Sequence, residues 1–224
     1  MHKYCYIFIL LLIIGTVACE KNVVEPHINH SSKYAPLEIG MKWTYQMDSI
    51  SYSGFVGDKP DTLKYLIRNE IKESFVNNLG KEAFLIEKMY KLGPSFDWTF
   101  SRQYSESKAD IELLRTEFDN TKVVLSFPLL TDKEWNGNQY STGGEIDFYY
   151  ESIHQNEMVG SFQYDSTTTV MQEESINAIQ SFFLREKYAA GFGLVSQEYE
   201  HLQNLGMPTQ KGSKYKLTLI SFEK

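Results

Sequence analysis

Few side chains of this sequence are spaced to bind a metal, and the only closely spaced histidines are His27 and His30. With Glu25 beside them, they are donors that zinc accepts. They lie, however, in a polar run, residues 20–33, that contains Pro26 and shows no sustained apolar period. Zinc-binding imidazoles need fixed hydrogen-bond partners to orient them, and such a run does not supply these. We therefore expect no metal site.

Catalytic patterns are also absent from the sequence. There is no G-x-S-x-G elbow, no C-x-x-C pair and no phosphate-binding loop. The adjacent acids Glu173 and Glu174 are typical of a solvated strand edge rather than of an acid–base pair. We expect no catalytic residues, no cofactor and a protein that is not an enzyme. Of three hypotheses, an enzyme is less favoured than a binding or structural module for a hydrophobic ligand and a surface module for glycan or protein.

One residue has a definite chemistry, the thiol of Cys19. A short basic start is followed by the uncharged residues 4–18, a run too short for the about 20 residues that span a bilayer but typical of a signal peptide. Ala18 directly precedes Cys19, and the segment resembles the lipobox of bacterial lipoproteins, although Thr16 stands where Leu is usual. The resemblance implies that the thiol receives a diacylglycerol and that Cys19 becomes the new N-terminus. The alternatives are an uncleaved anchor and an ordinary cleaved signal.

This interpretation divides the chain into three parts. Residues 1–18 are the signal peptide, 19–33 are the lipidated cysteine with a flexible tether, and 34–224 are a single domain. Cys5 lies inside the signal peptide, so the mature chain would have no second cysteine for a disulfide. Two or more acyl chains suffice for stable anchoring, so the membrane is the expected partner.

Charge and composition limit the other partners. The formal net charge is −7, and a nucleic-acid surface needs a basic excess, so we expect no nucleic-acid binding. The chain is 42% hydrophobic and 14% aromatic, which is enough for a packed core. The sequence makes no prediction of an oligomeric state.

From residue 34 onward the pattern is that of strands. In residues 62–74, Leu63, Tyr65, Ile67 and Ile71 alternate with mostly polar residues, as in a strand that buries one face. Similar segments predict nine or ten antiparallel strands in a curved sheet: 41–52, 62–74, 81–92, 96–105, 111–118, 144–153, 158–171, 185–189, 194–202 and 214–222. The interval 172–183, with apolar residues at helical spacing, leaves one short helix open.

The alternation places a largely aromatic set on one concave face. Its members are Leu63, Tyr65, Ile67, Phe96, Trp98, Phe100 and Tyr104. A face of this kind either fills a core or lines a pocket for an apolar ligand, and the sequence leaves both open.

Two short motifs carry a resemblance to a known group. Residues 34–45 read Y-x-P-L-x-x-G-x-x-W-x-Y, and residues 188–195 read Y-A-x-G-x-G-L-V. Together they resemble a widespread group of Bacteroidota-type envelope lipoproteins. The resemblance implies a half-barrel or open barrel similar to periplasmic lipoprotein-carrier domains; it implies almost nothing about activity. An internal echo accompanies it, because Trp43 and Trp135 each follow a Pro-Leu pair by the same spacing.

Three triplets that start with Asp resemble the O-glycosylation acceptor of the same bacteria. The candidate acceptors are Ser49, Thr62 and Ser166. The alternative is that these Asp-Ser and Asp-Thr pairs form turns.

The sequence therefore predicts an envelope lipoprotein, lipid-anchored in the outer membrane and facing the periplasm or the cell surface. We expect a non-enzymatic binding or structural module that takes a lipid or another hydrophobic ligand. The alternative is a cell-surface module that binds glycan or protein through exposed aromatic side chains.

Overall fold

The computed structural model describes residues 33–109 and 111–224, and strands are the regular elements of this part of the chain. The strands are β1 (Lys42–Ser53), β2 (Asp61–Val76), β3 (Glu82–Lys91), β4 (Thr99–Ala109), β5 (Glu112–Glu117), β6 (Asn120–Ser126), β7 (Glu134–Asn136), β8 (Asp147–Val159), β9 (Phe162–Ile176), β10 (Gln180–Ala189), β11 (Gly193–Gln203) and β12 (Lys211–Glu223). The predicted all-β antiparallel class is confirmed, while the predicted count of nine or ten strands is too low.

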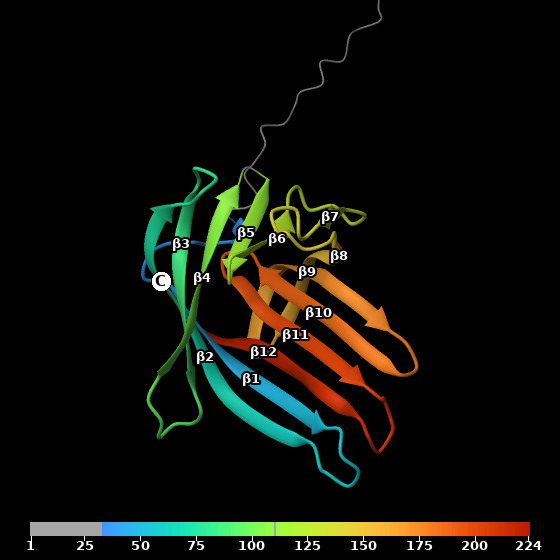
Figure 1. Ribbon diagram of the computed structural model, residues 1–224. Helices are drawn as coiled ribbons and strands as arrows, with labels where there is room; N and C mark the ends of the chain where they lie inside the picture. Colours follow the sequence, from blue (N-terminus) through green and yellow to red (C-terminus); the bar gives the residue numbers. More distant parts are fainter. Residues whose placement is uncertain (1–32, 110) are drawn as a thin grey trace, which may run out of the picture.

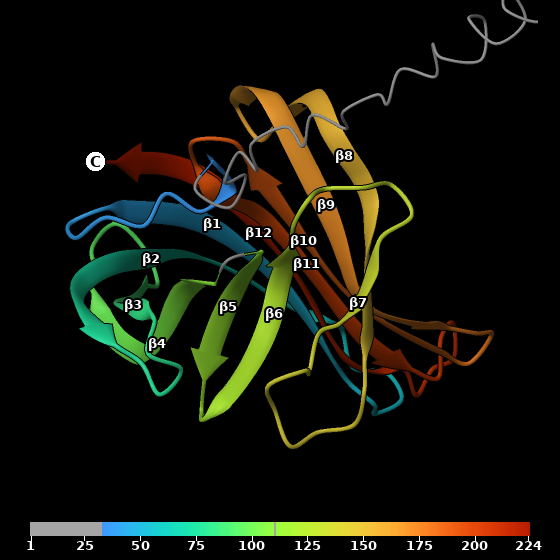
Figure 2. The same cartoon turned by 90° about the horizontal axis from the view of Figure 1, so that it is seen from above.

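All strands belong to one 12-stranded sheet in the order β6-β5-β4-β3-β2-β1-β12-β11-β10-β9-β8-β7. The chain thus makes two meanders, β1 to β6 and β7 to β12, and the β1–β12 pair joins them (Figure 1). Because the sheet curls, the two meanders become two walls that face each other across an interior (Figure 2).

The edge strands of the two meanders meet through a few contacts. The amide of Val123 in β6 donates to the carbonyl of Gly137, just after β7, at 2.9 Å. The phenol of Tyr150 in β8 accepts from the amide of Ser126 at 3.1 Å and donates to its carbonyl at 2.6 Å. These bonds pair some of the backbone groups at the two edges of the sheet, where β6 and β7 do not pair as neighbouring strands. The sheet is therefore a barrel that is nearly closed.

Residues 172–183 do not form the short helix that the spacing of their apolar residues left open. The strand β9 continues to Ile176, and β10 begins at Gln180. Between them the side chain of Asn177 accepts from the amides of Ile179 and Gln180, which makes a hairpin turn. Ile176 and Ile179 are 59% and 57% exposed, so no apolar helical face is buried here.

The ten predicted strands correspond to ten of the twelve observed, and the two that the prediction lacks are β6 and β7. The turn at Gly160, which has a φ of +61°, only moves a boundary, because residues 158 and 159 belong to the end of β8. The strand β6 follows β5 through Phe118 and Asp119, both at positive φ, and these are not the Asn-Gly residues that usually signal such a turn. The strand β6 also has buried residues on both faces, so it does not alternate.

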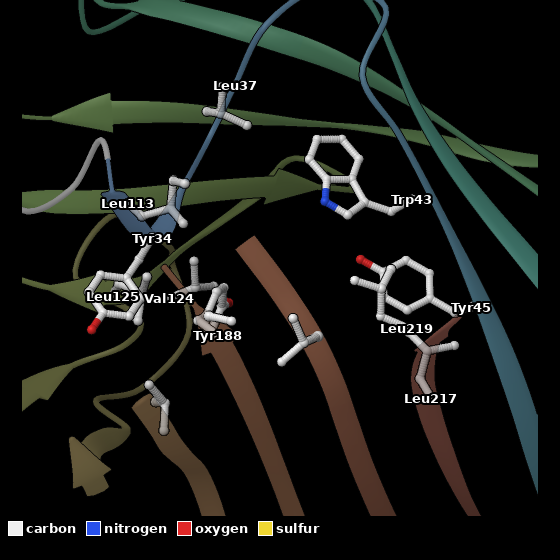
Figure 3. Packing of buried hydrophobic residues seen from close by; sticks show 14 of the residues in the cluster. Tyr34, Leu37, Trp43, Tyr45, Leu113, Val124, Leu125, Tyr188, Leu217 and Leu219 are labelled. Atoms are coloured by element: carbon white, nitrogen blue, oxygen red, sulfur yellow. The ribbon is translucent and has the colours of Figure 1, made fainter. Parts of the chain in front are cut away.

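One end of the interior is densely packed where the two sequence motifs meet, and only about 30 Å³ stays open among their side chains. Tyr34 and Leu37, in the segment before β1, are buried and belong to the same apolar cluster as Tyr188 (Figure 3). The indole of Trp43 donates to the carbonyl of Phe192 at 2.6 Å, and the phenol of Tyr45 donates to that of Leu194 at 2.9 Å.

Gly193 allows this close approach of the two motifs. Its φ is +78°, and a Cβ there would lie 3.4 Å from Cδ of Pro36. Trp135, the echo of Trp43, is likewise the second residue of the first strand in its meander. Its indole donates to the carbonyl of Val123 at 2.8 Å. Both tryptophans therefore fix the start of a meander.

Candidate functional site: an interior cavity with a basic wall

Beyond the packed end, the interior is hollow. A cavity of about 440 Å³ lies between the wall of β2 to β6 and the wall of β9 to β12. Its volume is within the about 300–1,000 Å³ typical of small-molecule sites. Its lining residues are Asn69, Lys88, Arg102, Tyr104, Arg115, Glu117, Phe118, Asn120, Lys122, Val124, Gln172, Leu184, Glu186, Leu194, Gln197, Tyr215 and Leu217. The cavity reaches the surface at Phe118, which is 80% exposed.

Strand alternation directs charged side chains into this cavity. Lys88 lies between Ile86 and Tyr90 on the inner face of β3, in register with Asn69 of β2 and Arg102 of β4. Residues two apart on a strand point to the same face, so a charged residue between two inward apolar residues also points inward. The same holds for Glu186, between Leu184 and Tyr188 on β10.

A buried ion-pair network joins the two walls. Arg115 of β5 donates from Nε to Glu106 at 2.8 Å and from Nη1 to Glu186 at 2.6 Å. Its Nη2 donates to the phenol of Tyr188 at 3.2 Å. Since Glu186 and Tyr188 belong to the opposite wall, these bonds tie the first meander to the second.

Amide side chains complete the shell around Glu186. Gln172 donates to one carboxylate oxygen at 2.7 Å, and Gln197 donates to the other at 2.6 Å. The phenol of Tyr188 also donates to this carboxylate. Glu186 is only 1% exposed, so each of its lone pairs must be satisfied inside the protein.

The network alters the acid–base properties of its members. Burial would raise the pKa of Glu186, but the charge of Arg115 and the hydrogen bonds from Tyr188 and Gln197 lower it below its usual value. Burial would lower the pKa of Arg115, but the charges of Glu186 and Glu106 raise it well above its usual value. Both groups are therefore held charged in the interior.

Lys88 has no such partner. Within the described residues it makes no hydrogen bond and no ion pair, although it lines the cavity. Burial and the positive charge of Arg102 lower the pKa of Lys88 to about 8. Its neighbour Asn69 is 6% exposed, and its carbonyl oxygen has no hydrogen-bond partner either. Two unpaired polar groups thus lie side by side at the cavity wall.

Two further cations line the same wall. Arg102 pairs with Glu117, and Lys122 has its ammonium 6.0 Å from the ring centroid of Phe148. Four basic and two acidic side chains line the cavity in all, and Glu106, which pairs with Arg115, adds a third acid. The wall therefore carries excess positive charge in a chain whose net charge is −7.

The aromatic set predicted from the sequence does not form one face. Ile67 is buried, Tyr65 and Tyr104 pack on the core, and Leu63 shares their inner face but is 48% exposed. Of these, only Tyr104 lines the large cavity.

A β-bulge moves the rest of the set elsewhere. Lys88 pairs with Arg102 but Met89 pairs with Phe100, so Ser101 is an extra residue in β4 and the facing reverses there. Phe100 is 54% exposed on the outer face. Trp98 lies just before β4, and the guanidinium carbon of Arg68 lies 4.2 Å from the centroid of its ring. Phe96, in the loop before β4, is 58% exposed. The prediction that Phe96, Trp98 and Phe100 point to the concave face is therefore wrong.

The other candidate residues are scattered. Ser49 is half-buried on β1, and Thr62 is exposed on β2. The hydroxyl of Ser166 shares hydrogen bonds with the phenol of Tyr34 at 2.9 Å and with Nδ1 of His154 at 3.3 Å. Cys19, the signal peptide and His27 with His30 lie outside the described residues.

Within the described part of the chain, no group of three or more Cys, His, Asp or Glu side chains is arranged to hold a metal ion. None of the described segments forms a helix with the length and apolar character needed to cross a bilayer.

The fold and the cavity define a class of protein: an open antiparallel β-barrel with a polar, basic interior site. No protein-family model and no curated protein sequence matches the chain. Two solved structures are similar. A protein of Bacteroides fragilis that is thought to be exported and has a YmcC-like fold shares 10% identity at a TM-score of 0.48, over 86% of this chain and 99% of that one. A protein of Parabacteroides distasonis thought to be a lipoprotein shares 10% identity at a TM-score of 0.43, over 85% and 98%. Both TM-scores are below 0.5.

Proposed function

We propose that this protein is an envelope lipoprotein whose β domain is a non-enzymatic binding module with its ligand site in the interior. Acyl chains on Cys19 would anchor it in the outer membrane, and residues 20–33 would connect the anchor to the domain. The domain would face the periplasm or the cell surface.

The observation that carries the binding role is the difference in filling along the interior. At one end of the barrel the side chains leave a cavity of only about 30 Å³, whereas the cavity at the other end is about 440 Å³ and reaches the surface. A domain that needed only stability would gain by filling this space with apolar side chains. The retained opening and its polar lining favour a ligand.

The anchor is tested by metabolic labelling. Cells that make the full chain are grown with radiolabelled palmitate, and the protein is compared with its Cys19→Ser variant. The proposal predicts label in the first and none in the second. Label in neither protein would overturn the lipid anchor.

The ligand site is tested by native mass spectrometry of the chain from residue 20 onward, purified without detergent. The proposal predicts added mass that organic or acid extraction removes and that the cavity variant Leu184→Trp reduces. Leu184 lines the cavity, so a larger side chain there fills it. The bare chain mass in every preparation, with no binding to any probe described below, would leave a structural role.

The alternative is a module that binds glycan or protein on its surface. It is favoured by exposed aromatic side chains in loops, since Phe55 is 72% and Phe96 is 58% exposed. Loss of partner capture on substitution of these two residues, with no effect of Leu184→Trp, would support this alternative over an interior site.

A further inference from the structure

We propose that the interior cavity is a site for an organic anion, a phosphate or carboxylate group carried on an apolar or ring-shaped body, with Lys88 as the residue that binds the charged group. This inference rests on the proposed binding function and specifies its ligand. It replaces the hydrophobic ligand expected from the sequence with one that is charged at one end.

The first support is the unpaired state of Lys88. The ammonium group has three donors, and none of them has a partner among the described residues. A cation held at the edge of a protein interior without a partner costs free energy, which an incoming anion would recover. Asn69 lies in register beside it, but its unpaired atom is the carbonyl oxygen, an acceptor, so the attraction for an anion comes from the ammonium group of Lys88.

The second support is the charge around Lys88. Arg102 lies in register with it on the adjacent strand, and Arg115 and Lys122 line the same wall. The acids Glu117, Glu186 and Glu106 are already paired with the two arginines. An anion entering the cavity would therefore meet excess positive charge.

The third support is the opposite wall. There Tyr215, Leu184 and Leu217 face the basic residues across the cavity. The ring of Tyr215 stacks on Tyr199 with centroids 5.0 Å apart, and its phenol donates to Gln197 at 3.1 Å, so its position is fixed. A fixed aromatic and aliphatic surface favours a ligand with an apolar face, and not a bare inorganic ion alone.

A matched pair of fluorescent probes tests the proposal. Anilinonaphthalene sulfonate carries a sulfonate on two aromatic groups, and N-phenylnaphthylamine has the same aromatic groups without the charge. Both are titrated into the chain from residue 20 onward, which contains every described strand and must first show a cooperative melting transition. We expect the charged probe to bind at least about tenfold more tightly than the neutral one, as one charge-assisted hydrogen bond provides.

Variants locate the binding. Lys88→Met should remove most of the preference for the charged probe, because it removes the unpaired cation and keeps the length of the side chain. Lys64→Met is the matched control, since Lys64 is exposed on the outer face and pairs with Asp48 at 3.0 Å. It should leave both affinities unchanged.

Competition identifies the chemistry of the ligand. Decyl phosphate and inorganic phosphate are each used to displace the charged probe. Displacement by both indicates that the charged group is sufficient, and displacement by decyl phosphate alone indicates an amphiphile; each result supports an anion site. Displacement by neither would overturn it.

The inference and the proposed function fail differently. Equal binding of the two probes, unchanged in Lys88→Met, would overturn the anion site while leaving an interior apolar pocket. Binding of neither probe to the folded chain would overturn the interior binding function as well.

Discussion

The two ends of the barrel interior are built in opposite ways. At one end the segment around Tyr34 and Leu37 fills most of the space, and the indole of Trp43 donates a hydrogen bond to the carbonyl of Phe192, between β10 and β11. At the other end Lys88 and Asn69 face a cavity with no partners among the described residues. The first arrangement satisfies packing and hydrogen bonding together, and the second leaves both incomplete.

This difference separates stability from function within a single domain. The packed end joins the two motifs, so its residues should be costly to change. The cavity holds groups that reduce stability, so some changes there should raise it. The buried network of Arg115 and Glu186 lies at the boundary, because it lines the cavity and also ties the two walls together.

The largest loss should come from Arg115→Met. The substitution leaves the buried carboxylates of Glu106 and Glu186 without their cation and should lower the free energy of unfolding by about 3–5 kcal/mol. Chemical denaturation measures it. The control is Arg185→Met on the outer face, where the pairs with Glu151 and Glu198 are partly exposed and the cost should be about 1 kcal/mol or less. Equal losses in the two variants would show that Arg115 does not join the walls.

A smaller loss is expected for Trp43→Phe. It keeps an aromatic ring but removes the donor to the carbonyl of Phe192, and should cost about 1–3 kcal/mol. Trp98→Phe is the matched control, because Trp98 is half-exposed and makes no hydrogen bond through its indole among the described residues. The thermal midpoint of the first variant should fall, and that of the second should hardly move. A fall of similar size in both would contradict the special role of the packed end.

Lys88→Met should have the opposite sign. Removal of an unpaired, largely buried cation should raise the free energy of unfolding at pH 7 by about 1 kcal/mol, while Lys64→Met should change it little. Denaturation without ligand is the measurement. A loss of stability in Lys88→Met would mean that this ammonium group is already satisfied in the free protein.

The gain in Lys88→Met should also depend on pH. The pKa of Lys88 is about 8 in the folded chain, below the about 10.4 of an unfolded lysine. Between these values the unfolded chain binds more protons, so the contribution of Lys88 to stability rises with pH. The advantage of Lys88→Met should be full below about pH 8 and should shrink toward about pH 10. An advantage that is constant over this range would contradict the lowered pKa.

The sequence predicted the fold better than the site. Alternation in residues 62–74 and the two end motifs led to the curved antiparallel sheet, because both depend on local pattern. The aromatic face failed because one extra residue, Ser101, reverses which side chains point inward, and a bulge has no clear signal in the alternation.

A signal for the interior charges was nevertheless present. Lys88 and Glu186 each lie midway between two inward apolar residues of the same strand. A charged residue at an apolar position of an alternating strand is costly when buried, so this pattern marks either an ion pair or a site. The pairing of Glu186 and the unpaired state of Lys88 depend on contacts across the barrel, which one sequence does not give.

The most direct test of the account is the pKa of Lys88, measured by NMR on the side-chain amine, with Lys88→Met for assignment. The account predicts a value near 8 in the free protein and a rise when decyl phosphate or the charged probe is added, because an anion stabilises the protonated amine. A value near that of an ordinary lysine, unchanged by either anion, would contradict the claim that this cavity holds an unpaired cation for a ligand.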